Sequence, residues 1–163
     1  MSSLDYEKEL KDCKNFDEIF SLVKKAVREA LSKSRAGLML YLADLPLSVG
    51  AFHAFGTNGI VLNKKILSLI AKESESTKEL NLFVFSLLLH EYLHSLGYLD
   101  EKQVRDLTHR IVKEKFGEDR IVLETLKSLK PFSKTPELLE PISSERGMDI
   151  VLDFEKEGQK YIS

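Results

Sequence analysis

The sequence is poor in residues that cross-link or interrupt a fold. Its 163 residues include one cysteine (Cys13), no tryptophan, four prolines and eight glycines. A single cysteine excludes both an intrachain disulfide and a cysteine-rich zinc knuckle, and it is typical of a reducing compartment. The chain is long enough to bury a proper hydrophobic core. We therefore expect a single domain over residues 1–163.

The sequence also lacks an excess of charge of one sign. Lysine and arginine number 24 against 26 acidic residues, which gives a formal net charge of -2. Non-specific nucleic-acid binding usually needs a clear basic excess, so no nucleic-acid partner is expected. The N-terminus has no basic segment followed by an apolar one, and no apolar run is long enough for a membrane span. These absences predict a cytoplasmic protein without a membrane partner, whose oligomeric state is not determined.

In the first half of the chain, the spacing of the apolar residues changes after the first predicted long helix. Apolar residues recur at three- and four-residue spacings over 16–34, which predicts an amphipathic helix. The stretches "SVGAFHAF" and "GIVLN" then read as two short strands around a "GTNG" turn. The preceding "GLMLYLA" fits either a buried strand or a short helix.

The second half is predicted to be mainly helical. A short helix is expected over 64–72, and residues 78–96 form a long segment that is apolar nearly all round, as in a helix buried on most sides. An amphipathic helix follows, which Asp100 can cap, and another is expected near 119–129. Beyond Pro131 the chain becomes loop-like, and alternating apolar residues from Met148 suggest a strand.

Together these segments predict an α+β domain. A central buried helix is joined by two or three further helices and a small mixed sheet. Residues 131–163 are expected to form a loosely packed C-terminal extension.

The central helix carries a polar trio in the stretch "HEYLH". Because residues i and i+4 lie on one face of a helix, His90 and His94 can direct two imidazoles at one metal ion. Glu91 is rotated away from them by about 100° and can reach a water on the metal. The spacing predicts a zinc site with Glu91 as general base.

A catalytic zinc site with an open position for water needs a third protein ligand. Asp100 is the first candidate, because Gly97 lets the chain turn sharply after the helix. Glu101 is the neighbouring alternative, and His109 can approach if the next helix packs antiparallel. His53 is the least favoured of the histidines, since it lies in a predicted strand.

The stretch "HEYLHSLGYLD" resembles the extended zinc-peptidase pattern H-E-x-x-H-x-x-G-x-x-H/D. It is similar to the metzincin branch of the zincins, in the aspartate-bearing variant of snapalysin-type enzymes, and to minimal zincin-like domains of prokaryotes. The resemblance implies a zincin-like domain in which His90, His94 and Asp100 bind Zn²⁺, Glu91 is the general base and Gly97 makes the turn.

The same resemblance implies a substrate-binding strand. In such enzymes a strand just upstream of the active-site helix pairs with the extended substrate. "GIVLN" lies at the corresponding place, so Gly59, Ile60 and Val61 are expected to contact the substrate by strand addition.

The predicted function is that of a zinc metallopeptidase, a hydrolase of peptide or protein substrates. Two other interpretations remain open. Ribosomal-RNA maturation endonucleases use a similar H-x-x-x-H-x-x-G-x-x-H helix, although they do not require the glutamate. A non-catalytic zincin-like domain with a binding or regulatory role is the second.

Overall fold

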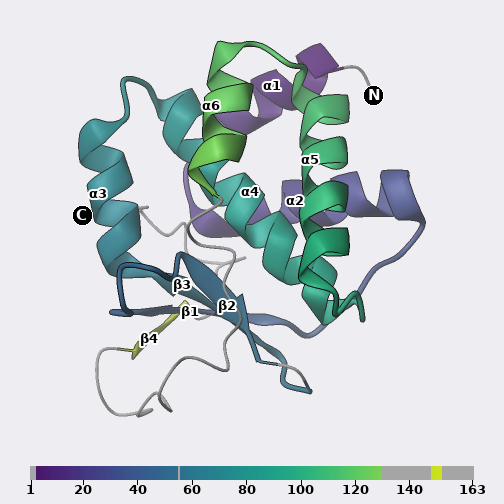
Figure 1. The fold of residues 1–163 in the computed structure, drawn as a ribbon, viewed down its shortest axis with the longest axis vertical. Helices are drawn as coiled ribbons and strands as arrows, with labels where there is room; N and C mark the ends of the chain where they lie inside the picture. The colour runs from purple at the N-terminus through teal and green to yellow at the C-terminus, as the bar shows by residue number, and fades with distance from the viewer. Residues whose placement is uncertain (1–2, 55, 130–147, 152–163) are drawn as a thin grey trace.

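A computed structural model describes residues 3–54, 56–129 and 148–151 (Figure 1). In these ranges the chain forms six helices and a four-stranded sheet. The helices are α1 (Ser3–Asp12), α2 (Phe16–Leu31), α3 (Lys64–Glu73), α4 (Thr77–Ser95), α5 (Glu101–Phe116) and α6 (Arg120–Ser128). The strands are β1 (Met39–Ala43), β2 (Ala51–His53), β3 (Gly59–Asn63) and β4 (Met148–Val151). The predicted α+β class is therefore confirmed.

Helix α4 is the centre of the molecule. It contacts all five other helices and also β2 and β3 (Figure 1). Ser76 caps its first turn by accepting a hydrogen bond from the Glu79 N–H, and the residues from Asn81 to Leu93 are all buried. A helix surrounded in this way must be apolar on every side, which is the pattern that the sequence displays. Even so, none of the described helices has both the length and the apolar character to cross a membrane.

The sheet has the strand order β2-β3-β1-β4. Strands β1 and β3 are parallel, whereas β2 and β4 run antiparallel to their neighbours, so the sheet is mixed as predicted. The predicted hairpin of two strands around the "GTNG" turn is confirmed as β2 and β3. "GLMLYLA" forms strand β1, and the alternation from Met148 corresponds to β4.

Asn63 fixes the loop between β1 and β2 to the start of α3. Its side-chain oxygen Oδ1 accepts from the Leu45 and Lys65 N–H groups, so it caps α3. Its side-chain nitrogen Nδ2 donates to the carbonyls of Leu45, Pro46 and Val49. The side chain is fully buried, and these bonds satisfy polar groups of a loop that would otherwise lack partners.

Helix α1 was not predicted, and the structure has five helices besides α4 in its described ranges rather than two or three. In helix α1 the side chains of Tyr6 and Leu10 are fully buried. The Tyr6 hydroxyl donates to Glu29 Oε1 at 2.6 Å, and the same oxygen accepts from Lys115 Nζ at 2.8 Å. Helix α1 is therefore held by contacts that are distant in sequence. Most of the predicted extension 131–163 lies outside the described residues.

Candidate metal site

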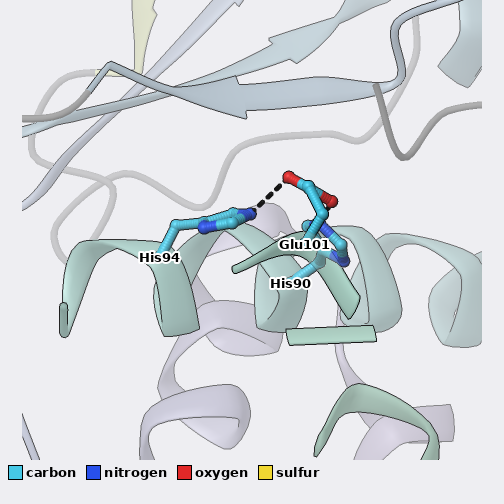
Figure 2. A group of neighbouring side chains, drawn as sticks. All are labelled: His90, His94 and Glu101. Atoms are coloured by element: carbon cyan, nitrogen blue, oxygen red, sulfur yellow. Dashed lines mark hydrogen bonds and ion pairs between the residues drawn. The ribbon is translucent and has the colours of Figure 1, made fainter. Parts of the chain in front are cut away.

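The two histidines of α4 lie on one side of the helix, below the sheet (Figure 2). Their ring centroids are 5.0 Å apart. His90 is 7 % exposed and the ring of His94 is largely shielded from solvent. The one-turn spacing thus brings both imidazoles to one point, as the sequence predicted.

Glu101 closes the group from the next helix. Its Oε1 lies 2.7 Å from His94 Nε2, and its Oε2 lies 3.0 Å from His90 Nε2. One ligand atom from each of these three residues falls within 4.8 Å of the others, a set that can hold a metal ion. Two imidazole nitrogens and a carboxylate oxygen match the His₂Glu donor set of catalytic zinc sites, so the residues fit the predicted ion.

The turn after α4 brings Glu101 back to the histidines. Gly97 has φ +105°, a left-handed conformation that side chains other than glycine's disfavour. Its N–H donates to the His94 carbonyl, and the Tyr98 N–H donates to the Leu93 carbonyl. These bonds end the helix as a Schellman-like cap and reverse the chain, so that α5 begins beside the end of α4.

The turn also orients the ring of His94. The Tyr98 carbonyl lies 2.8 Å from Nδ1 of His94, so Nδ1 donates and Nε2 points toward Glu101. Metal-binding histidines usually donate their second nitrogen to a carbonyl or carboxylate in this way. Burial lowers the pKa of His94, but the hydrogen bond to Glu101 and the charges of Glu91 and Glu101 raise it overall.

Asp100 does not take the position that the sequence analysis assigned to it. Its Oδ1 accepts a hydrogen bond from the Lys102 N–H at 3.1 Å, and it is the N-cap of α5. Glu101, the alternative ligand, follows it in the first turn of α5 and points toward the imidazoles (Figure 2). The group that can hold a metal ion therefore contains Glu101 in place of Asp100, whose side-chain oxygen caps the helix.

The Glu101 carboxylate is ionised at neutral pH. Burial raises its pKa, but the hydrogen bonds to His90 and His94 outweigh burial and hold the pKa at about 2. An anionic oxygen is the form that binds a cation. Its place in the first turn of α5 also favours negative charge.

Glu91 is buried beside this group and is 6 % exposed. Burial raises its pKa to about 7, against the opposing effect of His90 and His94 and of a backbone hydrogen bond from His53. A carboxyl group that titrates near neutrality can both accept and return a proton. The general-base role of Glu91 stays a prediction.

The strand next to Glu91 is β2, whereas the sequence predicted that a substrate pairs with Gly59–Asn63. That prediction is wrong as to the pairing strand, because β3 already pairs with β1 on one side and with β2 on the other. The Asn63 N–H donates to the Gly50 carbonyl, which makes Gly50–Asn63 a hydrogen-bonded pair. Since such pairs alternate, the backbone groups of Ala51 and His53 point away from β3. Ile60 and Val61 are buried within the sheet.

The other two histidines lie in different surroundings, and so does Tyr92, which stands between His90 and His94 in the sequence. His53 is buried and its Nδ1 lies 2.9 Å from the Gly59 carbonyl. His109 lies on α5 and is absent from the His90–His94–Glu101 group. Tyr92 is fully buried, packs edge-on against Phe20 and accepts a hydrogen bond from the Arg35 N–H. Tyr92 therefore packs in the core.

Arg35 is a residue of the site region that sequence reasoning missed. Its guanidinium donates to the Ser95 carbonyl at the end of α4, at 2.6 Å. It also donates to the Thr57 carbonyl and to Asn58 Oδ1 in the β2–β3 turn, at 2.9 and 2.7 Å. One side chain thus fastens the hairpin to the helix that carries both histidines. No local pattern in the sequence indicates this role of Arg35, because its hydrogen-bond partners lie more than 20 positions away.

Comparison with known proteins gives no match for this chain among protein-family models, curated proteins or solved structures. Fold and site define it as an α+β protein in which one buried helix and the start of the next form a His–His–Glu group that can hold a metal ion.

Proposed function

We propose that the protein is a zinc-dependent metallopeptidase. The observation that carries the proposal is the Glu101 carboxylate, which lies within hydrogen-bonding distance of both imidazoles while the buried Glu91 stands beside them. Three protein ligands leave a fourth position of a tetrahedral ion for water or substrate. A second carboxyl group with acid–base character is the remaining requirement for hydrolysis, and Glu91 supplies it.

A bound zinc ion supplies a Lewis acid and lowers the pKa of an attacking water to about 7. His90, His94 and Glu101 hold the ion, and the Tyr98 carbonyl keeps His94 in the required tautomer. Glu91 accepts the proton of the attacking water and delivers it to the leaving amine. Its contact with the backbone of His53 orients this carboxyl group.

The outer edge of β2 is the proposed binding strand for an extended peptide, in place of β3. The backbone groups of Ala51 and His53 point away from β3, and the His53 backbone already contacts Glu91, whereas those of β3 are used within the sheet. A peptide that adds to this edge gains main-chain hydrogen bonds without regard to its sequence. The strand places the scissile bond near the general base.

The experiment that tests the function combines metal analysis with assays of peptide and RNA cleavage. The parent protein should bind about one zinc ion and cleave unstructured peptides. The variant Glu91→Gln should keep the zinc and lose at least ~10²-fold in kcat, the scale of a general-base effect. An exposed-residue control, Glu114→Gln on α5, should retain full activity.

Three results would contradict the proposal. If Glu91→Gln cleaved peptides at the parental rate, Glu91 would not be the general base. Cleavage of RNA without cleavage of peptides would identify a different hydrolase. Absence of bound zinc, with no stabilisation by added zinc, would indicate a non-catalytic domain.

A further inference from the structure

A cavity of about 310 Å³ lies between α4, α5 and α6, and His90 forms part of its wall. Cavities that hold small ligands range from roughly 300 to 1,000 Å³, so this one is large enough for a single residue or a small molecule. Leu123, Leu126 and Leu129 give it an apolar wall. Leu123 is 40 % exposed, so this wall reaches the protein surface.

The polar residues of the cavity are mainly cationic. They are Arg105, Lys113 and Lys127, together with Thr108 and His109, and no aspartate or glutamate lines the cavity in the part of the chain that the structure describes. Lys113 is 3.8 Å from Glu118, a long and exposed ion pair. The cavity therefore combines an apolar wall with positive charge.

Two polar atoms of the cavity residues are buried without partners. Arg105 Nε and Thr108 Oγ1 are shielded from solvent and form no hydrogen bond among the described residues. Thr108 is 1 % exposed. Because both atoms are shielded, they do not face the open space of the cavity, and a ligand there meets the positive charge of the half-buried Arg105 guanidinium together with that of Lys113 and Lys127.

We propose that this cavity binds a carboxylate carried on an apolar group of the peptide substrate. This assignment rests on the proposed peptidase function. The positive charges of Arg105, Lys113 and Lys127 attract the carboxylate, and the leucines pack against the apolar part. Because His90 belongs both to the metal group and to the cavity wall, the bound residue lies next to the metal site. The carboxylate comes either from the C-terminus of the peptide or from an acidic side chain.

The test measures peptide binding by calorimetry in the Glu91→Gln background, which prevents hydrolysis. Three N-acetylated peptide probes are compared. The first is an alanine peptide that ends in leucine with a free C-terminal carboxylate, and the second is the same peptide with a C-terminal amide. The third also ends in an amide but contains an internal glutamate. At least one carboxylate probe should bind roughly 10-fold or more tightly than the neutral amide, since a charge-assisted hydrogen bond is lost with the amide. Which of the two binds identifies the source.

Variants of the cavity separate this site from general charge attraction. Arg105→Gln should abolish the preference for the carboxylate probe, whereas Arg110→Gln, the same change at an exposed position of α5, should preserve it.

Three outcomes overturn the inference. The first is equal binding of all three probes, and the second is an equal loss in Arg105→Gln and Arg110→Gln. The third is a preference that disappears when zinc is chelated and is unaffected by Arg105→Gln, because the carboxylate then binds the metal. A preference without peptide cleavage by the parent protein would reject the proposed function alone, and cleavage without a preference would reject this inference alone.

Discussion

At the scale of single residues, one position separates a member of the His–His–Glu group from a helix cap. Asp100 and Glu101 are adjacent carboxylates, yet the first binds the Lys102 N–H and the second lies at both imidazoles. A change of one residue rotates a side chain by about 100° around a helix. The role of each carboxylate is therefore set by where α5 begins.

This arrangement predicts opposite effects for two neighbouring substitutions. Glu101→Gln should lose stoichiometric zinc, because it removes the anionic ligand. Asp100→Ala should keep zinc but lower the free energy of unfolding by about 1 kcal/mol, the usual cost of an N-cap. Metal analysis and denaturant unfolding measure the two effects, and Asp100→Asn, which preserves the cap, is the control. Loss of zinc in Asp100→Asn with retention in Glu101→Gln would reverse the assignment.

Glu91 predicts a pH-dependent stability of the metal-free protein. Its pKa is about 7 in the folded state, above its ordinary value of 4.5. The folded state therefore holds more protons between these values, and stability falls as the pH rises through this window. Glu91→Gln removes the titrating group. At pH 8 the free energy of unfolding of this variant should therefore be higher than that of the chelated parent protein, by up to about 3 kcal/mol.

Denaturant unfolding of both chelated proteins from pH 4 to pH 8 measures this difference. It should shrink toward zero as the pH falls below 4.5, where the parental carboxyl group becomes neutral in both states. A difference that is constant over the whole range would mean that the pKa of Glu91 is not raised.

At the scale of elements, Arg35 joins two parts that carry the site. It links the end of α4 to the β2–β3 turn through three side-chain hydrogen bonds. Arg35→Lys keeps the charge but cannot reproduce the planar fork of donors. We expect a loss of about 1–3 kcal/mol in stability and faster hydrogen exchange in the β2–β3 turn.

Nuclear magnetic resonance can measure exchange at the Thr57 amide, which donates to the Ala54 carbonyl inside this turn. Arg110→Lys, at an exposed site on α5, provides the matched control. Unchanged exchange at Thr57 in Arg35→Lys would show that the turn is stable without the guanidinium contacts.

At the scale of the whole molecule, metal binding should be linked to folding. The three ligands come from two helices that meet only in the folded chain, so zinc binds the native state preferentially. With free zinc at 100 times the dissociation constant, the free energy of unfolding should rise by roughly 2.7 kcal/mol. Thermal unfolding with zinc and with a chelator measures this rise. His94→Ala should show none, and an equal rise in that variant would place the zinc elsewhere.

The fold was predictable where local pattern and burial agree. The spacing of apolar residues predicted α2 and α5, because each of these helices buries a continuous face. Helix α4 was predicted from a segment that is apolar nearly all round, because the helix is buried on most sides. Helix α1 escaped detection because its packing depends mainly on Tyr6 and Leu10, too few apolar positions for a recognisable period. The order of strands was not predictable, since alternation shows that a strand exists but not which strand lies beside it.

By itself, the sequence determined the α+β class, the buried central helix and the pairing of His90 with His94, because all of these follow from spacing along the chain. Tertiary structure decided the rest. It brought Glu101 rather than Asp100 to the imidazoles, put β2 rather than β3 at the edge beside Glu91, and joined Arg35 to two distant elements. Each of these depends on the direction in which the chain returns after a turn, and that direction is set by packing between segments far apart in sequence.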